Sequence, residues 1–392
     1  MKNLLNLNTA DIPKEVHLIL ELLKYDDPTL INSEMFKAIN WGDFIDLSQH
    51  HRVYPVLYSK LKGLGEDVIP SYVIQHISQL YKRNTFQMLQ LSGVMEQVSR
   101  LFSNMHIPVI FLKGPMLAHD LYGDISLRTS SDLDFIIPMK QLSKAEALLL
   151  EQGYQKDDYI ETVLGDWTWR HHHVTYIHPQ TNIKLEIHWR LNPGPAREPS
   201  FKALWERKRI SDLTSFPVYL LAKEDLFLFL TSHGARHGWS RLRWLVDIQQ
   251  LIKQDIDWDR VYKLLKKFHY QRVGGQAIIL AADVLHVKLN RKMKLLAFTR
   301  YSKKLAQQAV FYLERKINLH TDPVPEAISR YHKRYLFALM GYRQKFFFIM
   351  SFLYPYPEDQ QTLPLPKAFH FLYFPLRPFL WAWRKTRKHA LP

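Results

Sequence analysis

The chain has 392 residues, 47% of them hydrophobic, which is enough for a large buried core in two or three domains. It contains no cysteine, which excludes disulfide bonds and thiolate metal sites. The formal net charge of +16 calls for an acidic partner to be considered, for which nucleotides, nucleic acid and anionic lipid all qualify; the alternative is a basic surface that only confers solubility.

Residues 1–104 are predicted to form an N-terminal helical region. The first residues lack a basic segment followed by a long apolar run, so we expect no signal peptide and a cytoplasmic protein. Apolar residues recur at helical spacing from Pro13 to Gly63, including the periodic segment Asp43–Leu61, and Ser71–Asn104 is predicted as one long amphipathic helix. We expect this region to pack against a catalytic core, with a lid over a cleft as the alternative.

The central segment, residues 105–199, opens with an apolar strand at Val109–Leu112 that ends in Lys113 and Gly114. A short helix is predicted over Pro115–Leu121, because proline is tolerated at an early helical position. A helix N-terminus behind a glycine turn presents free N–H groups that suit a phosphate, and Gly114 would let the backbone approach it.

A second apolar run carries Asp132 and Asp134, which point to the same face of a strand because their spacing is two residues. Two adjacent carboxylates repel unless a cation lies between them, and oxygen ligands favour a hard ion such as Mg2+. A strand over Ile183–Trp189 places Glu186 on the same face as its neighbours Lys184 and His188. If the two strands pair, Glu186 completes a site of three carboxylates. The alternative for the two aspartates alone is a strand edge or a capping pair.

A helix is predicted over Ser143–Gln152, and an aromatic, histidine-rich segment follows, with His171, His172 and His173 in succession. Successive strand residues point to opposite faces, so we expect no compact three-histidine metal site from this run. The alternative is that one of the three histidines faces the cleft, toward the acceptor or a phosphate. Alternation does not indicate which one. The proline-rich stretch that ends at Pro199 closes the central segment.

Residues 200–392 are predicted to form a C-terminal helical region. Its expected helical segments are Lys223–His237, Leu242–Lys253, Tyr262–Leu285, Leu295–Ile317 and Ile328–Tyr354. His233, near the end of the first of these, is either a packing histidine or a cleft residue. The apolar run Phe346–Leu353 is too short to span a membrane, which needs about 20 residues.

The tail Phe369–Trp383 mixes aromatic residues with a basic end, a composition that fits peripheral contact with an anionic membrane. Pro375 and Pro378 argue against one regular amphipathic helix. Packing of the tail into the core is the alternative.

Several of these features, taken in order, resemble the DNA polymerase β-like nucleotidyltransferase superfamily, and most closely a branch of largely uncharacterised bacterial nucleotidyltransferases. They are Lys113-Gly114, Leu121-Tyr122, Arg128, Asp132-x-Asp134, Glu186-x-His188-Trp189 and the segment His233–Trp239 with Leu242, Trp244 and Asp247. The resemblance covers about Pro108 to Leu251. Better-known members have Gly-Ser at the turn after the first strand, where the serine contacts a phosphate, and this chain has Lys113-Gly114-Pro115 there.

The resemblance implies an α+β fold, in which a small mixed β-sheet core is flanked by the N-terminal and C-terminal helical regions. It implies transfer of a nucleoside monophosphate from an NTP, with ATP expected, to an acceptor hydroxyl, with release of pyrophosphate. Mg2+, or Mn2+ in its place, would be held by the catalytic residues Asp132, Asp134 and Glu186. The residues expected to contact the nucleotide are Lys113, Gly114, Arg128, His188 and His233, although Arg128 could instead pair with Asp132.

The acceptor is expected to be a small molecule, a saccharide or a peptide. Two alternatives stay open. One is an inactive nucleotide-binding or interaction protein of the same fold. The other is an enzyme that modifies RNA or a protein, and the positive charge is the only feature of the sequence that directly suggests it.

Overall fold

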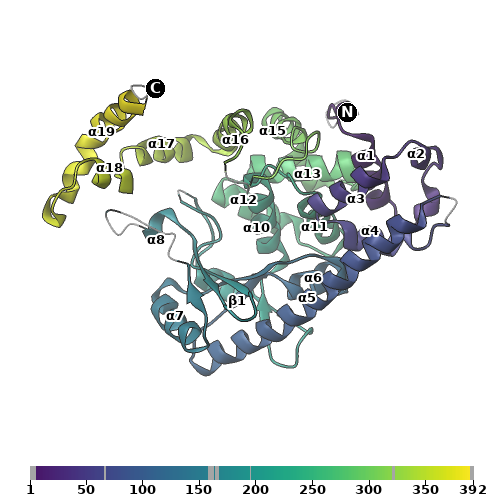
Figure 1. Cartoon of the computed structure of the whole chain (residues 1–392), viewed down its shortest axis with the longest axis horizontal. Coiled ribbons are helices and arrows are strands. Elements are labelled where there is room, and N and C mark those ends of the chain that lie inside the picture. The colour runs from purple at the N-terminus through teal and green to yellow at the C-terminus, as the bar shows by residue number, and fades with distance from the viewer. Residues whose placement is uncertain are drawn as a thin grey trace.

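The computed structural model describes residues 6–65, 68–157, 163, 167–194, 196–319 and 323–388. Within them the chain is mostly helical, and the strands form one mixed sheet in the middle of the molecule (Figure 1). The predicted α+β fold with flanking helices is therefore confirmed. The first five residues, where no signal peptide is expected, lie outside the described residues.

The N-terminal region is helical, as predicted. Its helices are α1 (Lys14–Lys24), α2 (Glu34–Lys37), α3 (Trp41–His50), α4 (Tyr54–Leu61) and α5 (Ser71–Asn104), with a 3-10 turn at Pro28–Leu30. The periodic segment Asp43–Leu61 divides into α3 and α4 because the chain turns at Arg52, whose φ is 56°. Helix α5 has the predicted bounds and runs along the sheet (Figure 1).

The sheet has the strand order β3-β4-β5-β2-β1-β7-β6 over the described residues. The strands are β1 (Ile110–Lys113), β2 (Asp132–Ile136), β3 (Gln155–Lys156), β4 (His173–Ile177), β5 (Lys184–His188), β6 (Arg209–Ser211) and β7 (Val218–Leu220). Strands β2 and β5 lie side by side in parallel, with Asp134 opposite Glu186, so the pairing that the three-carboxylate prediction required is present. Strand β1 is antiparallel to β2.

Two strands lie beyond residue 199, in the region predicted to be helical. Strand β7 pairs in parallel with β1, where Phe111 lies opposite Leu220, and β6 pairs with β7. The sheet therefore continues past the proline-rich stretch that we took as the end of the central segment.

Short helices surround the sheet: α6 (Pro115–Tyr122), α7 (Leu142–Glu151), α8 (Trp167–Arg170) and α9 (Phe201–Arg207), with 3-10 turns at Ile125–Leu127 and Met139–Gln141. Gly123, with φ of 74°, ends α6 and donates its N–H to the carbonyl of His119. Gly153 has φ of 85° just after α7.

The C-terminal helices that pack on the core are α10 (Lys223–Arg236), α11 (Leu242–Lys253), α12 (Trp258–Phe268), α13 (Gln271–Leu285), α14 (Arg291–Ala297) and α15 (Arg300–Val310). The segment Leu295–Ile317, predicted as one helix, is broken before Arg300, where the Thr299 side chain caps α15 by accepting the N–H of Ser302.

The end of the chain forms an arm that extends from the body (Figure 1). Helix α16 (Glu326–Leu339) packs beside α15, and the arm beyond it contains α17 (Tyr342–Ser351), α18 (Pro357–Thr362), a 3-10 turn at Lys367–Leu372, and α19 (Tyr373–Lys388). Packing of the tail into the core is wrong for most of its aromatic side chains, since Phe371, Phe379, Trp381 and Trp383 are 54–72% exposed. Among the described helices none is long and apolar enough to cross a bilayer.

The expectation that two prolines prevent a regular helix in the tail is also wrong, because α19 includes both. Pro375 lies in the first turn, where a missing N–H costs little. Pro378 lies inside the helix and removes one backbone hydrogen bond without ending it. The buried carboxylate of Asp359 pairs with Arg377 and Arg384 and so holds α18 against α19.

Candidate active site

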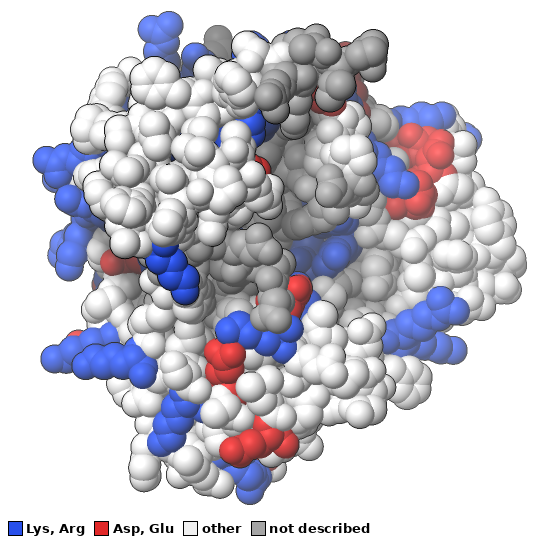
Figure 2. Space-filling view, turned by 60° about the vertical axis from the view of Figure 1, so that its left-hand side comes forward, with Lys and Arg blue, Asp and Glu red and all other residues white. Residues whose placement is uncertain are grey.

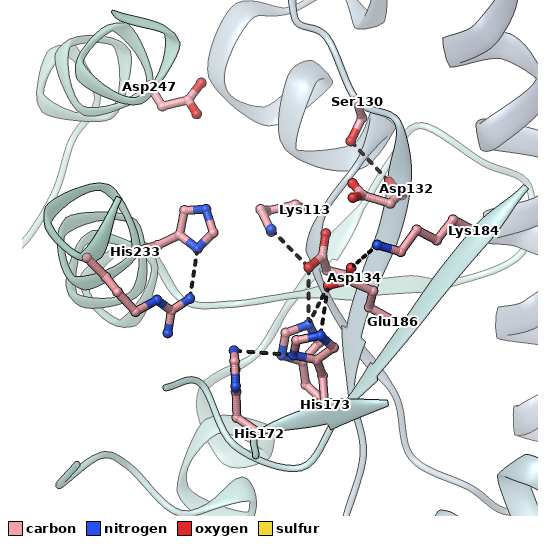
Figure 3. A network of polar contacts seen from close by, with 12 residues as sticks. Lys113, Ser130, Asp132, Asp134, His172, His173, Lys184, Glu186, His233 and Asp247 are labelled. Atoms are coloured by element: carbon pink, nitrogen blue, oxygen red, sulfur yellow. Dashed lines mark hydrogen bonds and ion pairs between the residues drawn. The ribbon is translucent and has the colours of Figure 1, made fainter. Parts of the chain in front are cut away.

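A cavity of about 460 Å³ lies between the sheet and helices α10 and α11. Its lining includes seven Lys or Arg side chains and three carboxylates, so it attracts anions. The basic residues are Arg52, Lys113, Arg128, Lys184, Arg236, Arg241 and Arg243, and the acidic ones are Asp132, Asp134 and Glu186. Figure 3 shows the strand residues and His233 of α10 pointing into this space from opposite sides.

Asp134 is the most deeply buried of the three carboxylates, with no exposed surface. Its Oδ1 accepts from Lys113 Nζ at 2.9 Å and lies 3.1 Å from His188 Nε2, while its buried Oδ2 has no hydrogen-bond partner in the described part of the chain. Burial opposes ionisation, yet Lys113 holds the pKa of Asp134 below its ordinary value. The carboxylate is therefore charged and has one oxygen to offer.

Glu186 faces Asp134 from the adjacent strand. Its Oε1 lies 2.8 Å from Lys184 Nζ and its Oε2 lies 3.6 Å from His188 Nε2, so the predicted shared face of Lys184, Glu186 and His188 is present. Burial acts against the charged form, but the nearby His188 ring and the charge of Lys113 hold the pKa of Glu186 well below its ordinary value.

The three predicted carboxylates, Asp132, Asp134 and Glu186, do not all lie equally close together. Asp134, Glu186 and His188 have ligand atoms within 4.8 Å of one another, and among the described residues Asp132 belongs to no such group. Asp132 lines the same cavity, and burial together with the charge of Asp134 raises its pKa. The unpartnered Asp134 oxygen and the carboxylate of Glu186 fit a divalent ion.

Two histidines that the sequence analysis did not assign lie beside this group. His172 and His173 both line the cavity, although we expected one of the run at most to face the cleft. Residue alternation does not apply to both rings, because His172 lies in a bend before β4 and only His173 is in the strand. Burial lowers the pKa of His173 to about 4 and that of His172 further, so both rings are neutral near pH 7.

Arg128 does not pair with Asp132, the alternative considered for it. Its Nε and Nη2 donate to the two carboxylate oxygens of Asp247 at 2.9 and 3.0 Å, and Tyr122 donates to the same carboxylate at 2.8 Å. Arg128 and Asp247 are 1% and 0% exposed. Arg128 still contributes to the cavity lining, and Asp247 lies behind it.

Helix α10 supplies the opposite wall. His233, Arg236 and His237 lie one turn apart and all line the cavity, so the structure places His233 in the cleft. Arg236 Nη2 lies 3.4 Å from His233 Nδ1, and the His237 ring stacks on Trp244 of α11. Burial and the nearby charge of Lys113 keep the pKa of His233 well below its ordinary value.

The cavity lining also includes three arginines that no sequence motif predicted, namely Arg52, Arg241 and Arg243. Arg241 donates to the carbonyl of His50, and Arg243 donates to the carbonyl of Thr129 at 2.6 Å. Arg52 brings the N-terminal region to the cavity, in addition to its predicted packing role. The spacing of His233, Arg236 and His237 was a usable helical signal, whereas Arg52 had none.

Gly114 is the one predicted nucleotide contact that does not line the cavity. Its φ of 121° belongs to a region that side chains rarely adopt, and a Cβ there would lie 2.9 Å from Leu133 Cδ2. The turn therefore requires glycine for the close approach of β1 to β2.

A mixed sheet that points carboxylates from adjacent strands into a basic cavity is the arrangement that the nucleotidyltransferase resemblance implies. Residues 37–286 match the family described as an uncharacterised nucleotidyltransferase, and the chain belongs to this family. Among solved structures, the chain is similar to MenT4, a nucleotidyltransferase toxin from Mycobacterium tuberculosis H37Rv. The two are 16% identical, with a TM-score of 0.28, over 67% of this chain and 97% of that one. No curated protein matches the chain.

Proposed function

We propose that the protein transfers a nucleoside monophosphate from an NTP to an acceptor hydroxyl and releases pyrophosphate. The observation that carries this proposal is the pairing of Asp134 with Glu186 across parallel strands, inside a cavity whose other charged residues, apart from Asp132, are basic. A triphosphate brings several negative charges, and such a cavity compensates them.

The ion expected for this reaction is Mg2+, with Mn2+ as a substitute, and Asp132, Asp134 and Glu186 would hold it. When bound, it would stabilise the attacking and leaving oxygens of an in-line displacement. The pairing that sets Asp134 opposite Glu186 supports this assignment, and among the described residues the buried Oδ2 of Asp134 has no hydrogen-bond partner.

The basic side chains orient the triphosphate. Lys113 reaches the floor of the cavity beside Asp134, and Arg236 and Arg243 reach it from α10 and α11. An arginine binds a phosphate with a planar fork and a lysine with a point charge. The sheet, through Lys113, and the helices, through Arg236 and Arg243, therefore contact the triphosphate in different ways. Positioning rather than covalent chemistry then supplies the rate.

The test is label transfer from each of the four NTPs carrying 32P at the α-phosphate, with candidate small molecules, saccharides, peptides and RNA as acceptors. Wild type is expected to produce a labelled acceptor and pyrophosphate, and Asp134→Asn is expected to abolish both. Asp212→Asn, which removes an exposed carboxylate, is the matched control and should leave the rate unchanged. Full activity of Asp134→Asn would overturn the assignment. Tight NTP binding without turnover on any acceptor would favour an inactive nucleotide-binding protein.

A further inference from the structure

Three imidazole rings gather on the side of the cavity next to Glu186. The ligand nitrogens of His172, His173 and His188 lie within 4.8 Å of one another, and His173 Nδ1 lies 3.3 Å from His172 Nε2. The ring centroids are 4.5, 5.0 and 5.4 Å apart. Figure 3 shows His172 and His173 turned toward the same space as Glu186.

The sheet builds this cluster. Strands β4 and β5 are antiparallel, and their register places His173 directly opposite His188. His172, in the bend that precedes β4, adds the third ring from the side. Cross-strand neighbours stand about 5 Å apart, so the register alone brings two of the rings within reach of one ion.

His188 is oriented as a metal ligand would be. Its Nε2 lies 3.1 Å from Asp134 Oδ1, and no described residue offers its buried Nδ1 a hydrogen bond. A ring nitrogen left unpaired in the interior costs free energy, and a carboxylate on the other nitrogen is the common partner of a metal-bound histidine.

We propose that His172, His173 and His188 bind a divalent first-row transition ion such as Zn2+, beside the oxygen-rich site of the three carboxylates. Imidazole nitrogens suit such ions, whereas Mg2+ prefers oxygen. Three protein ligands leave a fourth position, and Glu186 Oε2, 3.8 Å from His173 Nε2, is placed to share it. This site does not depend on the proposed nucleotidyl transfer.

The test is a titration of the metal-free, full-length protein with Co2+, followed by visible absorption and then by displacement with Zn2+. One equivalent of Co2+ should produce an absorption band that Zn2+ removes. His172→Ala/His173→Ala should lose the band, and His76→Ala, which removes an exposed histidine of α5, should keep it. Circular dichroism checks that each variant is folded.

Absence of the band in wild type, or its full retention in the double variant, would overturn the site. Asp132→Asn is expected to keep the band while losing Mg2+-dependent binding of the NTP, so that the two metal sites are separated. Loss of the band in Asp132→Asn would contradict a separate imidazole site. Failure of the Co2+ experiment would leave the NTP measurements unaffected.

A second surface stands apart from the cavity. The C-terminal arm, residues 342–386, carries more than half of the exposed large apolar side chains among the described residues. Those of the arm with an aromatic ring are Tyr342, Phe346, Phe347, Phe352, Phe369, Phe371, Phe379, Trp381 and Trp383. Figure 2, which brings the arm forward, shows wide uncharged surface with more Lys and Arg around it than Asp and Glu.

The exposed charged residues of the arm are basic, with the single exception of Glu358. Its acidic residues are Glu358 and Asp359, and Asp359 is buried against two arginines. Arg343, Lys367 and Lys385 are exposed. Exposed aromatic rings interleaved with cations fit the interface of an anionic lipid bilayer, where apolar acyl chains lie beneath negatively charged headgroups.

We infer that the arm binds the surface of a membrane that contains anionic lipid. The full-length protein is expected to co-sediment with phosphatidylcholine vesicles that contain phosphatidylglycerol, and much less with phosphatidylcholine alone. Phe379→Ser/Trp381→Ser/Trp383→Ser should abolish co-sedimentation, and Phe86→Ser, an exposed phenylalanine on α5, should not. Raising the salt should weaken binding.

Wild type that stays in solution with both kinds of vesicle would overturn this inference. So would equal binding by the triple variant. A dimer in sedimentation velocity that the triple variant dissolves, without vesicle binding, would assign the arm to a second copy of the chain instead.

Discussion

Arg128 and Asp247 form a buried, two-point ion pair between residues that are 119 positions apart. The pair joins the segment that leads into β2 to helix α11, and Tyr122 completes it. It therefore fixes the strand of Asp132 and Asp134 against the helical wall of the cavity. Because both partners are almost fully buried, the charge of either one would be left without hydration if the other were removed.

Asp247→Ala is expected to destabilise the protein by about 3–5 kcal/mol, because it leaves the Arg128 guanidinium buried without its partner. Urea unfolding followed by circular dichroism measures the change. Asp212→Ala, which removes an exposed carboxylate beside His119, should leave the unfolding midpoint unchanged. Equal effects of the two substitutions would contradict the structural role of the pair.

Gly114→Ala is expected to destabilise the protein by about 1–3 kcal/mol, since alanine rarely adopts the backbone conformation at this turn. The new Cβ would also meet Leu133 Cδ2 at 2.9 Å. Gly93→Ala is the matched control. Gly93 lies inside α5 with nothing within 4 Å of an added Cβ, so alanine there should stabilise by about 0.5–1 kcal/mol. Thermal unfolding of both variants should therefore move in opposite directions, and a shift of the same sign would be evidence against the strained turn.

Acid should weaken the contact between the N-terminal region and α11. Burial lowers the pKa of His50 to about 4, below its ordinary value near 6.5. Between these two pH values the unfolded chain binds more protons than the folded one, so this part of the stability is present above about pH 6.5 and is lost as the pH falls toward 4.

His50→Gln should reduce the loss of stability between about pH 7 and pH 5, measured as the shift of the urea midpoint. His76→Gln, at an exposed position on α5, should show the wild-type shift. An unchanged shift in His50→Gln would mean that other groups account for the acid sensitivity.

Periodicity was sufficient where the structure depends on local pattern. The bounds of α5 and α11, and the shared face of Lys184, Glu186 and His188, follow from repeats of 3.6 and 2 residues. The placement of Glu186 opposite Asp134 required only that β2 and β5 be neighbours.

What the sequence did not predict depends on contacts between distant segments. Strands β6 and β7 have three residues each, too few for an alternating pattern to stand out, and their pairing with β1 makes them strands. The partner of Arg128, Asp247, lies 119 positions away in α11, so no local feature points to it. His172 enters the cavity because of a bend in the backbone, which residue alternation does not describe.

The most direct test of the central claim is thermal unfolding with each NTP, with and without Mg2+, for wild type and for Asp132→Asn/Asp134→Asn. A ligand that binds only the folded state stabilises it by about 2.7 kcal/mol at about a hundredfold excess over its dissociation constant. We predict Mg2+-dependent stabilisation of wild type by at least one NTP, and its loss in the double variant. No stabilisation by any NTP, or equal stabilisation of the double variant, would contradict a nucleotide site built on these carboxylates.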